Sequence, residues 1–130
     1  RGDLKEAIEI SGLGPRIDDK IKTYSKGMKR RLVLAALLTV GAKVLLLDEP
    51  TAGIDVVHAV EIRRLVREYA VDRKAAVVYS SHNMLEVESI CDQVYFINNG
   101  VVADSGAPRE LIAKYSASNL EEAFVRAISV

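Results

Sequence analysis

The hydrophobic and polar residues of this chain follow two spacings, and each spacing predicts its own kind of element. Apolar residues three and four positions apart indicate helices, whereas short unbroken apolar runs between turn residues indicate strands. Helices are predicted at residues 3–10, 16–22, 25–40, 56–73, 83–91 and 108–115. Strands are predicted at residues 44–47, 75–80, 93–97 and 101–104. A last amphipathic helix should follow Ser118, which can form a capping box with Glu121.

The predicted helix at 56–73 carries the clearest amphipathic pattern. Asp55 can cap its first turn. Its apolar stripe consists of Ile62, Leu65, Val66, Tyr69 and Ala70. Arg64 and Glu68 are four positions apart and can pair on the outer face.

Other segments are apolar enough to predict full burial. The longest helical pattern is apolar nearly all round from Leu32 to Leu38, and Gly41 should close that helix. The runs at 44–47 and 75–80 do not alternate with polar residues, so they predict buried strands of a parallel sheet. Asn98-Asn99-Gly100 is a hairpin-turn signal. Strands alternating with helices favour an α/β fold with a mainly parallel sheet flanked by helices.

Composition is typical of a one-domain globular protein and does not indicate a particular reaction or ligand. The 130 residues are enough for one domain, with 49% hydrophobic and 28% charged residues. The 18 basic and 18 acidic residues balance, so net charge predicts no bulk attraction to nucleic acid or to a membrane surface. The single cysteine excludes an internal disulfide, and no apolar run is long enough to span a bilayer.

Two carboxylates, Asp48 and Glu49, directly follow the first predicted strand, and Pro50 ends the run. Ligands of parallel sheets bind beyond the carboxyl ends of the strands. Because side chains alternate along an extended chain, the two acids should point in different directions. One acid could then hold a metal while the other handles a water, as phosphoryl transfer requires. Taken alone, an Asp-Glu pair is more often part of a solvated loop.

Three further positions carry candidate chemistry, and each has an ordinary alternative. The longest predicted helix opens with Tyr24-Ser25-Lys26-Gly27-Met28, where free backbone N–H groups can bind an anion or simply be capped by the serine. Asp55 ends the next loop, where it can serve only as a helix cap. His82 follows the second predicted strand, as a ligand-binding or a solvent-exposed histidine. His58 has no partner signal and is assigned no role.

Together these segments resemble the ATP-binding cassette (ABC) ATPase family. The family signature motif is similar to Tyr24-Ser25-Lys26-Gly27-Met28, with Lys and Met in place of Gly and Gln. Walker B and the catalytic glutamate are similar to Val44–Asp48 and Glu49. The D-loop is similar to Ala52–Asp55, and the switch histidine to His82. All four motifs agree in order and spacing, and the resemblance covers essentially the whole chain.

The resemblance implies ATP and Mg²⁺ as cofactors and gives each matched residue a role. Asp48 would hold Mg²⁺ through water, and Glu49 would polarise the attacking water. His82 would contact the γ-phosphate and stabilise its developing charge. The helix start at Ser25-Lys26-Gly27-Met28 would bind an ATP held by a second subunit. Asp55 would connect the two sites of that head-to-tail dimer.

One family motif is missing from this sequence. A P-loop needs G-x-x-x-x-G-K-[ST], and no glycine here precedes Lys-Ser or Lys-Thr. We therefore expect the C-terminal half of an ABC ATPase, a partial P-loop NTPase domain whose P-loop strand is absent. Its expected parts are a piece of the helical signature subdomain at 1–41, the C-terminal part of the RecA-like core at 42–106, and C-terminal helices at 107–130. We expect this chain alone to be inactive toward ATP and its sheet to keep unpaired edges.

The leading interpretation is the ATPase subunit of a membrane exporter, bound beneath a permease on the cytoplasmic side of the cell membrane. The Lys-Met signature and Asn119-Leu120-Glu121-Glu122 resemble the ATPase subunits of ABC-2-type exporters. A soluble ABC ATPase acting on ribosomes or nucleic acid is the first alternative. We expect no nucleic-acid partner, because Lys29-Arg30-Arg31 is typical of a solvated helix face. A non-enzymatic ABC-derived module is the second alternative.

Overall fold

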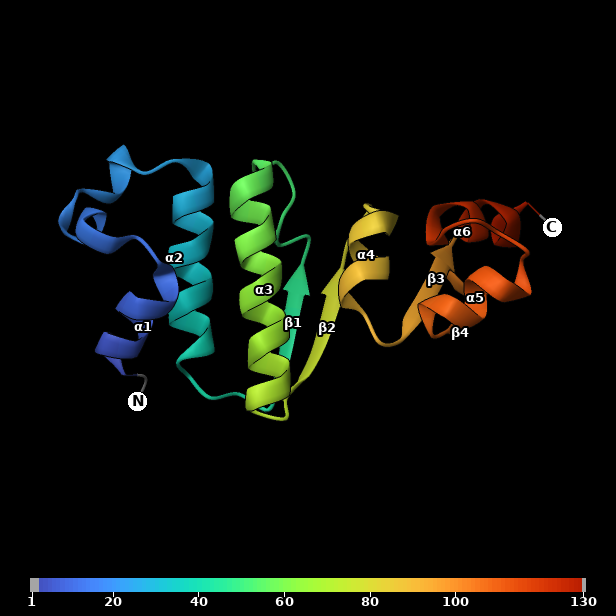
Figure 1. The fold of residues 1–130 in the computed structure, drawn as a ribbon, viewed down its shortest axis with the longest axis horizontal. Helices are drawn as coiled ribbons and strands as arrows, with labels where there is room; N and C mark the ends of the chain where they lie inside the picture. Colours follow the sequence, from blue (N-terminus) through green and yellow to red (C-terminus); the bar gives the residue numbers. More distant parts are fainter. Residues whose placement is uncertain (1–2, 130) are drawn as a thin grey trace. The chain divides into compact units, whose positions relative to one another are not determined.

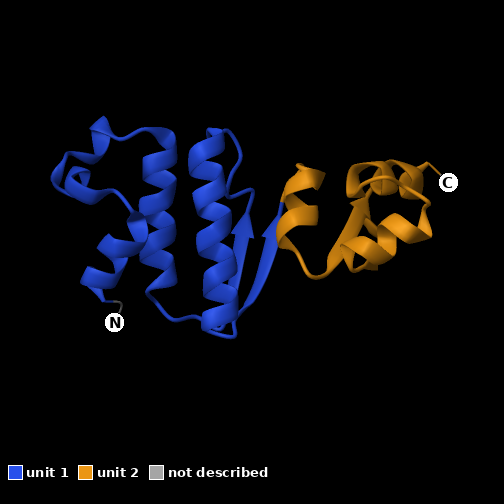
Figure 2. Cartoon of the chain, viewed as in Figure 1, with its two compact units in different colours: residues 1–80 blue, residues 81–130 orange. Residues whose placement is uncertain are grey.

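The computed structural model describes residues 3–129, which fall into two compact units that meet in sequence between Ser80 and Ser81 (Figure 2). Unit 1 ends at Ser80 and unit 2 begins at Ser81. Each unit is described by itself below. The three-part division at 1–41, 42–106 and 107–130 concerns the subdomains of the family and stays a prediction.

Unit 1 combines helices with a short parallel sheet. Its elements are α1 (Leu4–Ser11), η1 (Gly14–Asp18), η2 (Ile21–Thr23), α2 (Lys26–Leu38), β1 (Val44–Asp48), α3 (Val56–Asp72) and β2 (Ala76–Ser80). Figure 1 shows α2 beside α3, and α3 along the sheet. β1 and β2 pair in parallel, in a register that ends with Asp48 opposite Ser80. The carboxyl ends of both strands therefore lie at one edge of the sheet, as the sequence predicts.

The strands of unit 1 are covered on one face rather than on both, which corrects the prediction of full burial. Leu45 and Leu47 are buried, whereas Val44 and Leu46 are 60% and 75% exposed. On β2, Val78 is 61% exposed. An apolar run without polar alternation predicts cover on both faces. Among the described residues, the second face of this sheet is exposed. Buried and exposed residues therefore alternate along β1.

In unit 1, α2 and α3 begin at their predicted caps. Ser25 Oγ accepts a hydrogen bond from Met28 N at 3.1 Å, and Asp55 Oδ1 accepts one from His58 N at 3.1 Å. The predicted pair on α3 also forms, with Arg64 Nη1 donating to Glu68 Oε1 at 2.8 Å. Each of these contacts spans three or four residues, which is why the sequence alone could predict them.

Two helical predictions in unit 1 need correction. Residues 16–22 form no continuous helix, because Asp19 and Lys20 take extended conformations that separate η1 from η2. α2 ends at Leu38 rather than near residue 40. Nor is it buried all round, because Val33 is 66% exposed.

Unit 2 packs helices against one antiparallel hairpin. Its elements are α4 (Met84–Ile90), β3 (Val94–Asn98), β4 (Val101–Gly106), α5 (Pro108–Lys114) and α6 (Leu120–Ile128). The hairpin turn has φ 49° at Asn99 and 78° at Gly100, the left-handed pair that the Asn-Gly signal predicts. Its core consists of Val87, Val94, Phe96, Leu111, Leu120 and Ala123. Phe96 also meets Phe124 edge to face, with ring centroids 5.2 Å apart.

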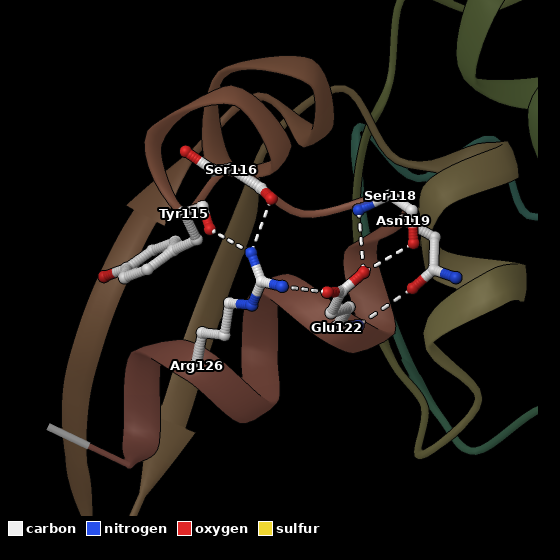
Figure 3. Close-up of polar contacts among 6 residues, drawn as sticks. All are labelled: Tyr115, Ser116, Ser118, Asn119, Glu122 and Arg126. Atoms are coloured by element: carbon white, nitrogen blue, oxygen red, sulfur yellow. Dashed lines mark hydrogen bonds and ion pairs between the residues drawn. The ribbon is translucent and has the colours of Figure 1, made fainter.

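The last helix is capped by Asn119 rather than by Ser118, which corrects the predicted capping box between Ser118 and Glu121 (Figure 3). Asn119 Oδ1 accepts from Glu122 N at 2.8 Å. Glu122 Oε2 accepts from Ser118 N at 2.8 Å and from Ser118 Oγ at 2.5 Å. Asn and Ser are both strong N-cap residues, so the sequence could not separate them. Glu122, and not Glu121, is the acid that reaches back, and it accepts from the N–H of Ser118, one residue before the cap.

Candidate functional site

β1 ends at Asp48, and the neighbouring strand fixes its carboxylate. Ser80 Oγ donates to Asp48 Oδ1 at 2.5 Å. The same hydroxyl accepts from Glu49 N at 3.0 Å, and the Ser80 carbonyl accepts from that N–H at 3.1 Å. One serine therefore holds the side chain of the first acid and the backbone of the second. Asp48 nevertheless remains exposed.

Glu49 leaves the strand conformation, with φ at 49°. Left-handed backbone is uncommon outside glycine and costs free energy unless surrounding contacts maintain it. Side-chain alternation along an extended strand therefore does not decide where Glu49 points, which corrects the sequence argument. Arg30 supplies a maintaining contact, because its Nη1 donates to the carbonyls of Glu49 and Pro50 at 3.1 and 2.8 Å.

Arg30 is a site residue that the sequence reasoning missed. The run Lys29-Arg30-Arg31 suggested a solvated face, yet Arg30 is half-buried and joins α2 to the turn after β1. Its acceptors are backbone carbonyls 19 and 20 residues away. Backbone carbonyls carry no residue-specific pattern, so no sequence signal identified this contact.

The turn at Ser25-Lys26-Gly27-Met28 and the loop at Ala52–Asp55 both belong to unit 1, together with Asp48 and Glu49. Gly27 is buried and lies against the ring of His58, and Lys26 reaches Gly53. Within this unit the structure thus joins three of the four predicted motifs through α2 and α3.

His82 belongs to unit 2, where a closed set of hydrogen bonds surrounds it. Ser81 Oγ donates to Glu86 Oε2 at 2.9 Å and accepts from Asn83 N at 3.0 Å. Asn83 Oδ1 caps α4 by accepting from Glu86 N at 3.3 Å. In a capping box the N3 glutamate reaches the N-cap N–H directly. Here Ser81 relays that contact, and the relay spans the backbone of the exposed His82.

Glu86 is the second residue that the sequence reasoning missed. Its side chain is buried, with 4% exposure. Buried carboxylates need hydrogen-bond partners, and Ser81 provides one. A signal did exist in the sequence, because Asn83 and Glu86 have the spacing of a capping box.

The residues at the end of β1 fit a Mg²⁺ ion that arrives with a nucleotide. Mg²⁺ is usually held by one or two carboxylates, and phosphate oxygens and waters complete its shell. Asp48 supplies one exposed carboxylate whose orientation Ser80 fixes. Within residues 3–129, no three His, Cys, Asp or Glu side chains gather as a metal site of their own. The single carboxylate of Asp48 therefore fits a Mg²⁺ ion whose other ligands are phosphate oxygens and waters.

Comparison with known proteins gives the family. The family model described as ABC transporter matches residues 2–52. The ABC transporter ATP-binding protein YhcH of Bacillus subtilis is 44% identical over 101 residues, which are 78% of this chain and 33% of that protein. The chain belongs to the ABC transporter ATP-binding family.

Two further relatives extend the match across the chain. The linearmycin resistance ATP-binding protein LnrL of Bacillus subtilis is 37% identical over 95% of this chain and 42% of its own length. The structure of cbiO1 from Clostridium perfringens, part of the ABC transporter complex cbiONQ, superposes with a TM-score of 0.74 at 32% identity. That match covers 85% of this chain and 44% of cbiO1. This ABC chain thus has the α/β fold expected for it and spans a third to less than half of the relatives' length.

Among residues 3–129, none of the helices has both the length and the apolar character that crossing a membrane requires.

Proposed function

We propose that this ABC chain is part of an ATP-hydrolysing subunit that drives transport through a membrane permease. The observation that carries this proposal is the end of β1, where Ser80 fixes Asp48 and Arg30 holds the turn at Glu49. Catalysis of phosphoryl transfer depends on positioned charge rather than on covalent chemistry. The held carboxylate of Asp48 and the held backbone of Glu49 lie at the end of the sheet where ligands bind, and they support this requirement.

Each site residue has a proposed role in this reaction. Asp48 would hold Mg²⁺ through water, and the ion would neutralise charge on the phosphates. Glu49 would orient and polarise the attacking water. His82, framed by the Ser81 relay, would contact the γ-phosphate and stabilise charge in the transition state.

The remaining motifs are proposed to act between subunits. The helix start at Ser25-Lys26-Gly27-Met28 would bind the γ-phosphate of an ATP held by a second subunit, because helix N-termini favour anions. Asp55 would connect the two sites of a head-to-tail dimer. The dimer would sit beneath a permease, on the cytoplasmic side of the cell membrane. Isolated from the residues that complete the nucleotide site, this chain is proposed to be inactive toward ATP.

Export is the direction that we propose, with an ABC-2-type permease as partner. The proposal is supported by the Lys26 and Met28 variant of the signature and by the likeness to a linearmycin resistance protein. Matching relatives include proteins named for phosphate import and for lipopolysaccharide export, so the direction needs its own test. Inside-out vesicles carrying the complete transporter should accumulate substrate with ATP if it exports, whereas uptake only into right-side-out vesicles would contradict export.

The ATPase role is tested with Glu49→Gln in the complete protein. Removing a positioned general base lowers the rate by roughly 10²–10⁴-fold, while ATP binding should persist. Glu121→Gln is the matched control, because Glu121 is exposed on α6. Unchanged hydrolysis in Glu49→Gln would refute the assigned role. For the isolated chain, ATPase activity that disappears in Glu49→Gln would overturn its proposed inactivity.

A further inference from the structure

Two segments of unit 1, residues 25–28 (the signature turn) and residues 52–58 (the Asp55 loop with the first turn of α3), each contain a glycine that a side chain of the other segment covers. A Cβ placed on Gly27 would lie 2.6 Å from Cγ and 2.9 Å from Cβ of His58. A Cβ placed on Gly53 would lie 2.5 Å from Lys26 Nζ. A side chain at Gly27 would displace the His58 ring, whereas one at Gly53 would displace only the flexible end of Lys26, so the interlock of the two segments rests on Gly27 and His58.

The His58 ring acts in this interlock through its shape. Its side chain is 23% exposed, its Nε2 lies 4.0 Å from Asp55 Oδ2, and its Nδ1 is buried without a hydrogen-bond partner in the described residues. Its backbone N–H donates to Asp55 Oδ1 at 3.1 Å, which ties the ring's position to the D-loop aspartate. A buried, unpaired ring nitrogen contributes no favourable hydrogen bond. The favourable part of the contact is the packing of the ring against Gly27.

We propose that His58 is a positioning residue that fixes the signature turn at a set distance from Asp55. The side chain at position 58 fills the space that the missing Cβ of Gly27 leaves. The effect of His58 on catalysis rests on the proposed function. The packing of His58 against Gly27 does not depend on that function. The glycine at 27 is thus required by a neighbour in its own chain, in addition to any ligand that approaches the turn.

A double-mutant cycle on thermal unfolding of the complete protein tests the interlock. Gly27 does not have a positive φ, so Gly27→Ala probes space alone. In the wild-type background it should lower the unfolding midpoint by several degrees, because overpacking displaces the His58 ring. In a His58→Ala background the same change should be neutral or slightly stabilising, because alanine is the better helix former.

The control for this cycle is Val57→Ala, which shortens an exposed neighbour of His58 on the same helix and should not relieve Gly27→Ala. Loss of the same number of degrees in the His58→Ala background would overturn the interlock. Relief by Val57→Ala would overturn it as well, because the effect would then not be specific to position 58.

Steady-state kinetics of the complete protein test the positioning role. His58→Ala should lower kcat for ATP hydrolysis several-fold and leave KM for ATP unchanged. His58→Phe keeps a planar ring without nitrogens and should restore kcat. Equal loss in both variants would overturn positioning by shape, and so would full activity in His58→Ala. If wild type itself hydrolyses no ATP, the proposed function fails, and the unfolding cycle still decides the interlock.

Discussion

Ser80 Oγ donates to Asp48 Oδ1 at 2.5 Å, across the last pair of the parallel register between β1 and β2. The hydroxyl belongs to the strand that precedes His82 and the carboxylate to the strand that precedes Glu49. Because Ser80 also accepts from Glu49 N at 3.0 Å, one side chain holds the carboxylate of Asp48 and the backbone of Glu49. The geometry at the end of β1 thus depends on a residue 32 positions later in the chain.

Ser80→Ala should therefore disturb the acids without unfolding unit 1. The loss of an exposed hydrogen bond should lower the free energy of unfolding by at most about 1 kcal/mol. In the complete protein, ATP hydrolysis should fall further than this small change in stability explains. Ser80→Thr keeps the hydroxyl and should retain activity, and Ser105→Ala serves as an exposed serine control. Wild-type hydrolysis in Ser80→Ala would contradict a positioning role for this bond.

Ser81→Ala should loosen the backbone around His82. It removes the donor to Glu86 and the acceptor for Asn83 N, which leaves a buried carboxylate with one partner fewer. The free energy of unfolding should fall by about 1–3 kcal/mol. Amide hydrogen exchange at Asn83 should accelerate, and Ser81→Thr should keep it slow. Unchanged exchange in Ser81→Ala would show that the relay does not hold this turn.

Unit 2 should lose stability in acid through Asp104. The Lys114 ammonium, the Tyr115 hydroxyl and the Ser105 N–H bind its carboxylate and lower its pKa from 3.8 to about 2. A carboxyl whose folded pKa is lowered stabilises the fold above its unfolded pKa. That contribution is lost as the pH falls from about 4 to about 2.

The measurement for Asp104 is chemical unfolding of this chain between pH 2 and 5. Asp104→Asn should flatten the fall in stability below pH 4, because the titrating group is gone. Tyr115→Phe removes the donor that lies 2.5 Å from Asp104 Oδ2 and should reduce the fall in part. The same pH dependence in wild type and Asp104→Asn would assign the acid transition to other groups.

The open face of the β1–β2 sheet should make this chain self-associate. Val44, Leu46 and Val78 expose apolar side chains there, and a two-stranded sheet leaves one edge of each strand unpaired. Light scattering should show a mass that rises with concentration. Leu46→Lys should reduce the rise, whereas Leu85→Lys, on an exposed position of α4 in unit 2, should not. A strictly monomeric wild type at high concentration would contradict this expectation.

The sequence predicted the contacts that residues make with near neighbours. Ser25 and Asp55 cap their helices, and Arg64 pairs with Glu68, because each partner is three or four positions away. Asn99 and Gly100 form the hairpin turn because the two residues themselves tolerate positive φ. Even for such short-range contacts, the sequence could not decide whether Ser118 or its neighbour Asn119 caps the last helix, because both are strong N-cap residues.

By itself the sequence determined the order of elements, the motifs that place the chain in the ABC family, and the acids at the end of β1. Only the tertiary structure decided which contacts hold these segments in place. Arg30 donates to the carbonyls of Glu49 and Pro50, and His58 packs against Gly27. It also decided that β1 is covered on one face. These contacts join residues that are 19 or more positions apart, so they depend on how whole elements pack rather than on any local pattern.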